Sequence, residues 1–327
     1  MNPKRRQVLT GITAGTLAAT VPWAARAQAA YPSKPLTIIV PYPPGASSDQ
    51  TARLVQAKMS ETFGQPVIVE NRAGANGALG AAYVARMPAD GYTVLMATQP
   101  IVTINPFLQK DNKFDPLKEL APLTKAADAV VAICVNTALP VNSLAELIAY
   151  VKKNPGTLSF GTAGAGTPQH IGGIQLGQQA GIDMPHIPSK GGGPMVNDLI
   201  AGHVKVGIAT LSVFKPFMND SRVKVIAVGE PIRYAPYPDI PSVAETLPGF
   251  ELATWLGFFG PVGMPPQVSA ALESALVKAL NSPDVKTKLG ESALIVKADG
   301  AQALAKVVQS DRDAYSKIIR EHKITGD

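Results

Sequence analysis

The chain has little of what marks several common protein classes. It contains one cysteine, Cys134, among 327 residues, so it can form neither an internal disulfide nor a thiolate zinc site. Charged residues make up 17% and aromatic residues 6%, against 46% hydrophobic residues. This composition is typical of a globular chain. Cys134 stands in the apolar run 130–135, where it is expected as a small buried side chain. The length favours two compact lobes.

The positive charge is concentrated at the start of the chain. The formal net charge is +6, but the first 27 residues carry Lys4, Arg5, Arg6 and Arg26 and no acid. The remainder holds 26 basic and 24 acidic side chains, a net charge of +2. Without a basic stripe, the chain lacks the charge pattern that phosphate backbones require, and we expect no nucleic-acid partner.

Residues 1–30 are predicted to be an export signal. A basic segment precedes an apolar stretch at 8–25, and small residues offer cleavage after Ala27 or Ala29. Arg5-Arg6 resembles a twin-arginine signal. A membrane anchor is the alternative, but several threonines and Pro22 interrupt the stretch. No other stretch approaches 18 uninterrupted apolar residues, so we expect the mature protein to be soluble and, in a bacterium, periplasmic.

Short apolar runs alternate with amphipathic stretches along the rest of the chain. Strands are predicted at 36–41, 66–70 and 92–97, separated by helices at 47–64 and 78–87. A second series has strands at 130–135, 158–160, 184–187, 204–209 and 223–228, and helices at 143–153, 167–180 and 194–201. Three further helices are predicted at 266–281, 284–291 and 301–323.

This alternation predicts an α/β fold with mainly parallel sheets flanked by helices. We expect a two-lobe clamshell of the type II-like periplasmic binding protein kind. Lobe 1 would comprise 31–130 plus 253–327, and lobe 2 would comprise 131–252. Short crossovers near Val130 and Leu252 would act as hinges.

Common enzyme signatures are missing. The chain has no Gly-x-Ser-x-Gly elbow, no Gly-x-x-x-x-Gly-Lys-Ser/Thr loop and no His-Glu-x-x-His pair. Gly164-Ala-Gly166 opens like a dinucleotide fingerprint, but Gln169 occupies its third glycine position. The four histidines lack ligand spacing. We therefore expect no catalytic residue, no metal and no cofactor.

Four glycine-rich loops follow predicted strands, and each opens a helix. They span 42–49, 71–77, 161–170 and 189–194. Ligands of open α/β sheets bind at the carboxyl ends of strands, and free N–H groups at a helix N-terminus suit an anion. Ser48 and Thr167 are predicted helix N-caps, and Asp49 suits a first turn. One such loop is an ordinary turn, whereas four in two lobes favour a small anionic ligand in a cleft.

These loops carry a resemblance to a known family. Segments 31–45, 64–74, 90–93, 161–170, 188–191, 239–245 and 255–261, in that order, resemble the Bug (TctC-like) extracytoplasmic solute receptors of tripartite tricarboxylate transporters. The resemblance covers essentially the whole mature chain. It implies a receptor, not an enzyme, that closes on a small organic carboxylate and delivers it to integral-membrane permease subunits, with a monomer as the expected state.

The resemblance also implies a set of ligand-binding residues. They come from the loops of both lobes: Pro44, Gly45, Ala46, Ser47, Ser48, Asp49, Asn76, Gly77, Thr98, Thr162, Gly164, Gly166, Thr167, His170, Lys190, Gly191 and Thr210.

The chain departs from the family pattern at several loop positions. Ala46 stands where a second glycine is common, residues 167–169 replace a serine-rich run, and residues 189–193 replace Tyr-Lys-Gly. At 209–210 the acid that would suit an amino-bearing ligand is missing. These departures leave the identity of the carboxylate open.

Two alternative functions stay open on the sequence. A periplasmic sensor would bind the same ligand but dock on a signalling partner. An exported hydrolase would need Ser47 or Ser48 as a nucleophile near His170. For Lys190, ligand contact and a solvated loop position are both open, and His170 is expected either to touch ligand or to cap its loop.

Overall fold

The computed structural model describes residues 31–108 and 114–325. The predicted export signal lies outside the described residues. Tyr31 begins a compact unit that contains all the elements described below.

Three parallel strands form the first strand group, β1 (Leu36–Val40), β2 (Val67–Asn71) and β3 (Thr93–Thr98). Helices α1 (Ser47–Phe63) and α2 (Ala78–Ala85) connect them. Ile38 packs in the core with α1, whereas its neighbour Ile39 packs with α2 on the opposite face. Successive side chains of a strand point to opposite faces of the sheet. Because helices cover both faces here, a strand such as Leu36–Val40 is apolar at every position.

The second strand group repeats this arrangement. It contains β5 (Phe160–Thr162), β6 (His186–Pro188) and β7 (Val206–Thr210), which are parallel to one another. Helices α7 (Pro168–Ala180) and α8 (Gly192–Ala201) follow β5 and β6. Both groups therefore place their loops and helix N-termini at the carboxyl ends of parallel strands, as the sequence predicts.

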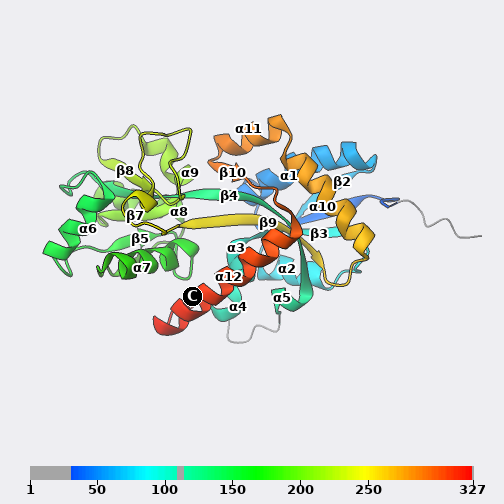
Figure 1. Ribbon diagram of the computed structural model, residues 1–327, viewed down its shortest axis with the longest axis horizontal. Coiled ribbons are helices and arrows are strands. Elements are labelled where there is room, and N and C mark those ends of the chain that lie inside the picture. Colours follow the sequence, from blue (N-terminus) through cyan, green and yellow to red (C-terminus); the bar gives the residue numbers. More distant parts are fainter. Residues whose placement is uncertain (1–30, 109–113, 326–327) are drawn as a thin grey trace, which may run out of the picture. The chain divides into compact units, whose positions relative to one another are not determined.

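Two long antiparallel strands join the groups, β4 (Leu120–Asn136) and β9 (Ala253–Pro261) (Figure 1). The strand order is β2-β1-β3-β9-β4-β7-β5-β6, and β8 (Val223–Val228) and β10 (Leu294–Val296) also pair with β4. The parallel character expected of the sheets thus applies to the two groups, whereas β4, β8, β9 and β10 are antiparallel.

The strand predicted at 130–135 is only the second half of β4. The first half contains Pro122, Lys125 and Asp128, which are poor strand formers. Pairing with β9 along Leu120–Val130 overrides that local preference.

The strand directions and pairings place the carboxyl ends of the two groups toward each other. Through β9, strands β1–β3 run in the same direction as β4, while β7 and its parallel neighbours run against it. Thr98 at the end of β3 pairs with Leu256, which pairs with Ala127 of β4. Thr210 at the end of β7 pairs with Val131. The carboxyl ends of both groups therefore point toward the middle of β4.

The remaining helices cover the sheet and its ends. They are α3 (Gln99–Thr103), α4 (Asn105–Leu108), α5 (Pro116–Glu119), α6 (Leu144–Lys153), α9 (Leu211–Phe214), α10 (Pro266–Leu280), α11 (Pro283–Glu291) and α12 (Gly300–Glu321), with short 3-10 turns η1 (Ala75–Gly77), η2 (Lys215–Phe217) and η3 (Val243–Glu245). Within the described residues, no helix combines the length and apolar character needed to span a bilayer.

Candidate functional site

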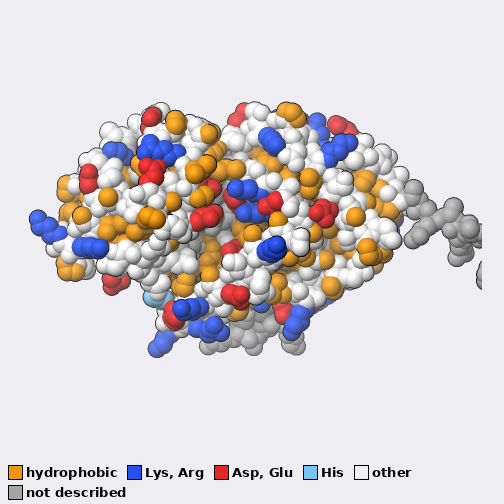
Figure 2. Space-filling model, in the orientation of Figure 1, with side chains coloured by type: hydrophobic (Ala, Val, Ile, Leu, Met, Phe, Trp, Pro, Cys, Tyr) orange, Lys and Arg blue, Asp and Glu red, His pale blue; other side chains and the backbone are white. Residues whose placement is uncertain are grey.

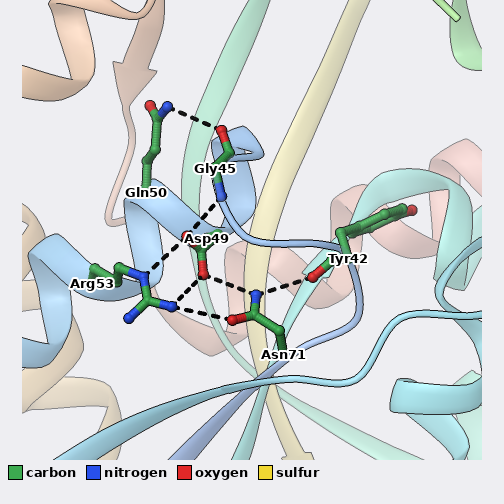
Figure 3. A network of polar contacts seen from close by, with 6 residues as sticks. All are labelled: Tyr42, Gly45, Asp49, Gln50, Arg53 and Asn71. Carbon is green, nitrogen blue, oxygen red and sulfur yellow. Dashed lines mark hydrogen bonds and ion pairs between the residues drawn. The ribbon is translucent and has the colours of Figure 1, made fainter.

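Asp49 organises the loop between β1 and α1 (Figure 3). Its carboxylate is 3% exposed and accepts hydrogen bonds from the Gly45 N–H at 3.0 Å, Arg53 Nε at 3.0 Å and Asn71 Nδ2 at 2.9 Å. Asn71 also donates to the Tyr42 carbonyl at 3.0 Å. Burial by itself would raise the pKa of Asp49, but these donors outweigh it and lower the pKa. Asp49 thus holds the loop in shape and is saturated by protein donors.

The first turn of α1 has no side-chain cap. Its N-cap is Ala46, which has no side-chain acceptor, so the prediction that Ser48 caps this helix is wrong. The N-cap therefore lies two residues before Ser48, and the Asp49 carboxylate accepts the Gly45 N–H just ahead of the helix. Ser48 Oγ is buried without a hydrogen-bond partner. Uncapped N–H groups and an unpartnered hydroxyl are donors that suit an anion.

The second loop is tied to the first strand group through backbone and tyrosine contacts. Asn76 adopts a φ of 51° and Gly77 a φ of 90° within η1. A side chain at Gly77 would come within 2.6 Å of Ile101, so the turn requires glycine. The Asn76 carbonyl accepts from Asn105 Nδ2 at 3.0 Å. Thr98 Oγ1 lies 2.9 Å from the Tyr42 hydroxyl.

The third loop, 162–167, satisfies its own polar groups. Thr167 caps α7 as predicted, accepting from the His170 N–H at 3.2 Å and donating to the Gly164 carbonyl at 2.9 Å. Thr162 Oγ1 donates to the same carbonyl at 3.0 Å. The Gly166 N–H donates to His170 Nδ1 at 3.1 Å. His170 therefore contributes to holding its loop through Nδ1, and contact of its ring with ligand stays a prediction.

The fourth loop leaves a second open helix N-terminus. The N-cap of α8 is Gly191, with a φ of 112° and no side chain to cap the first turn. The Gly191 N–H donates to the Ala163 carbonyl at 2.9 Å, which fixes this loop to the third one. Lys190 is exposed. Thr210 Oγ1 lies 3.1 Å from Ser212 Oγ at the start of α9.

Contacts bring loops of the two groups into proximity. Helix α4 begins at Asn105, which holds Asn76 of the first group, and ends at Leu108. A Cβ at Gly166 of the second group would lie 2.4 Å from Leu108 Cδ1. Between residues 44–49 and residues 162–191, both fully described, the structure shows no direct hydrogen bond. The predicted residues thus form two facing sets, each held together by its own bonds.

The hydrolase alternative finds no support in this geometry. Among the described residues, neither Ser47 nor Ser48 is hydrogen-bonded to His170, whose Nδ1 is engaged by the Gly166 N–H, and Ser48 Oγ has no partner at all. Within residues 31–108 and 114–325, no three His, Cys, Asp or Glu side chains are placed to hold a metal ion.

Five residues that shape these loops are not among the predicted ligand-binding residues. They are Tyr42, Arg53, Asn71, Asn105 and His186. Tyr42 and Asn71 stand at or just after strand carboxyl ends, the signal used for the other site residues. Arg53 and His186 gave no such signal, because their partners are set by helix geometry and by the pairing of β5 with β6.

Comparison with solved structures defines the class of protein. The periplasmic binding protein BugD is similar in fold, with a TM-score of 0.71 and 29% identity over 91% of this chain and 100% of that one. Rpa4515 of R. palustris, solved with adipate, has a TM-score of 0.76 and 30% identity over 90% and 99%. MatC of Rhodopseudomonas palustris, solved with malate, has a TM-score of 0.71 and 28% identity over 88% and 100%. The chain therefore has the α/β fold of periplasmic binding proteins.

The family can be stated more closely. Residues 51–324 match the model of the tripartite tricarboxylate transporter family receptor, TctC, and the chain belongs to that family. Its members are solute-binding receptors, not enzymes. The resemblance deduced from the loop motifs is thereby confirmed.

Proposed function

We propose that this receptor binds a small organic carboxylate between the two strand groups, with a ligand carboxylate at the first turn of α1. The observation that carries the proposal is the combination of an uncapped α1 N-terminus and the buried, unpartnered Ser48 hydroxyl. An anion there gains hydrogen bonds from groups that otherwise have none. The similarity to proteins solved with adipate and with malate supports the same ligand class.

The uncapped N-terminus of α8 supplies the matching donors in the second group. In this proposal Lys190 and Thr210 face the distal end of the ligand and set selectivity, while the third loop shapes the pocket wall. Lobe 1 comprises 31–130 plus 253–327 and lobe 2 comprises 131–252. The hinge for closure lies where Val130 pairs with Ala253, since the two segments that connect the lobes are adjacent there.

The ligand would be passed to integral-membrane permease subunits by a monomeric periplasmic receptor, exported through residues 1–30. A sensor that binds the same ligand would differ in its partner only. These roles are separated by measuring the uptake of the carboxylate that the protein binds in cells from which the protein has been deleted. Lost uptake supports delivery to a permease, and normal uptake with a lost transcriptional response supports sensing.

Binding is tested by thermal unfolding of the purified protein with adipate, malate, citrate and benzoate. A ligand present at 100 times its dissociation constant should stabilise the protein by about 2.7 kcal/mol. Adipamide, which has the carbon skeleton of adipate without its charge, is the control. The proposal fails if no carboxylate shifts the unfolding transition, or if adipamide shifts it as much as adipate.

Ser48→Ala tests the place of the carboxylate. We expect about tenfold weaker binding, because one hydrogen bond to a charged group is lost. The free energy of unfolding without ligand should not fall, since the removed hydroxyl has no partner. Thr51→Val is the matched control on the same helix: the Thr51 hydroxyl is buried but bonded to the Ser47 carbonyl at 2.7 Å. The Thr51→Val variant should lose stability and keep its affinity for the carboxylate. If Thr51→Val weakens binding and Ser48→Ala does not, the placement of the carboxylate is contradicted.

A further inference from the structure

We propose that His186 is a positioning residue for the ligand loops of the second strand group, acting through the hydroxyl of Thr162. This inference rests on the proposed carboxylate-binding function. It concerns a side chain on β6 that none of the loop motifs identified.

The hydrogen-bond inventory of Thr162 assigns the direction of the contact. Its hydroxyl has one proton, and that proton goes to the Gly164 carbonyl at 3.0 Å. His186 Nε2 lies 2.8 Å from the same oxygen. With the hydroxyl proton placed on the Gly164 carbonyl, Thr162 Oγ1 accepts, and the matching tautomer of His186 carries its proton on Nε2.

A second imidazole holds His186 in place. The rings of His170 and His186 stack with centroids 3.7 Å apart and planes 17° from parallel. His170 accepts the Gly166 N–H at its Nδ1, so its proton is on Nε2 as well. Burial lowers the pKa of His170 to about 4, with a smaller effect from His322, and that of His186 to about 3, with a smaller effect from His170. Both rings are therefore neutral at physiological pH, as the hydrogen bond from the Gly166 N–H to His170 Nδ1 requires.

The bond between His186 and Thr162 fixes more than one loop. The Thr162 hydroxyl donates to the Gly164 carbonyl within the third loop. The Thr162 carbonyl accepts the Ser189 N–H of the fourth loop at 3.1 Å. The next carbonyl, that of Ala163, accepts the Gly191 N–H at the N-cap of α8. Moving Thr162 would therefore move the uncapped N-terminus of α8, the proposed ligand donor of this group.

Two variants of His186 separate hydrogen bonding from packing. His186→Phe keeps a flat ring for the stack with His170 and removes the donor. His186→Gln restores an N–H donor at the same number of bonds from Cα. With the carboxylate that shifts the wild-type melt, calorimetry should show about tenfold weaker binding for the Phe variant. The Gln variant should bind within about threefold of wild type.

Thr162→Val removes the acceptor and completes a double-mutant cycle with His186→Phe. If the two side chains act through one bond, the double variant should bind about as weakly as either single variant. A Phe variant that binds like wild type overturns the inference, and so does a Gln variant that is as weak as the Phe variant. If His186→Phe does not fold, Thr162→Val and His186→Gln still decide the matter. Wild-type protein that binds no carboxylate overturns the proposed function and this inference together.

Discussion

Asp49→Asn is expected to lower the free energy of unfolding by about 2–3 kcal/mol and to weaken carboxylate binding at least tenfold. Asparagine keeps the shape but has one acceptor oxygen, whereas the carboxylate accepts from Gly45, Arg53 and Asn71. The amide NH₂ would face one of these donors. The loop that leads to the open first turn of α1 would then lose its anchor.

Chemical unfolding and calorimetry with the identified carboxylate measure both effects. The exposed Glu61→Gln on the same helix is the matched control, because Glu61 only reaches Lys58 at 4.0 Å on the surface. It should change stability by less than about 0.5 kcal/mol. The pKa of Asp49 is lowered from 3.8, so its contribution is present above that value and lost as the pH falls below it. A difference between Asp49→Asn and wild type that does not shrink as the pH falls below 3.8 would contradict this explanation.

Glu230→Gln is expected to stabilise the protein by about 2–3 kcal/mol at pH 8 and to leave its stability almost unchanged at pH 5. Glu230 is 3% exposed, and its Oε1 has no hydrogen-bond partner. Burial, with a smaller contribution from the charge of Asp128 and against the opposing charges of Lys297 and Lys125, raises its pKa from 4.5 to about 7. An ionised carboxylate in this place is costly, and a neutral amide avoids that cost.

The sign of the pH dependence follows from the raised pKa. Below pH 4.5 the group is protonated in both the folded and the unfolded state. Between pH 4.5 and about 7 only the folded state keeps the proton, so stability falls as the pH rises through this range. The melting temperatures of wild type and Glu230→Gln, measured from pH 5 to pH 8, should therefore diverge steadily.

The control for Glu230 is its exposed neighbour Glu251, whose charge also acts on Glu230. Glu251→Gln should give a curve nearly parallel to that of wild type. Figure 2 shows acidic and basic side chains gathered on the middle of this face. Asp128 of β4 forms ion pairs with Lys125 at 2.5 Å and with Lys297 at 3.1 Å. If Glu230→Gln also runs parallel to wild type, the buried carboxylate is not the group that titrates.

The sequence by itself determined the local parts of this protein. The β-branched run at β1 and the helix over 47–63 follow from periodicity and turn residues. The helix predicted at 143–153 is observed as α6, which begins at Leu144 directly after its N-cap Ser143. The loops at strand carboxyl ends were located in the same way. Each of these features depends on residues that are neighbours along the chain.

Tertiary structure decided the features whose partners are distant in sequence. The first half of β4 is a strand because β9, more than a hundred residues later, pairs with it. Asp49 stabilises its loop because Asn71 of β2 and Arg53 one turn along α1 reach its oxygens. His186 meets Thr162 only because β5 and β6 lie side by side. Periodicity specifies which face of an element is buried, but a buried polar group is defined by its partner, and only the folded chain brings that partner within hydrogen-bond distance.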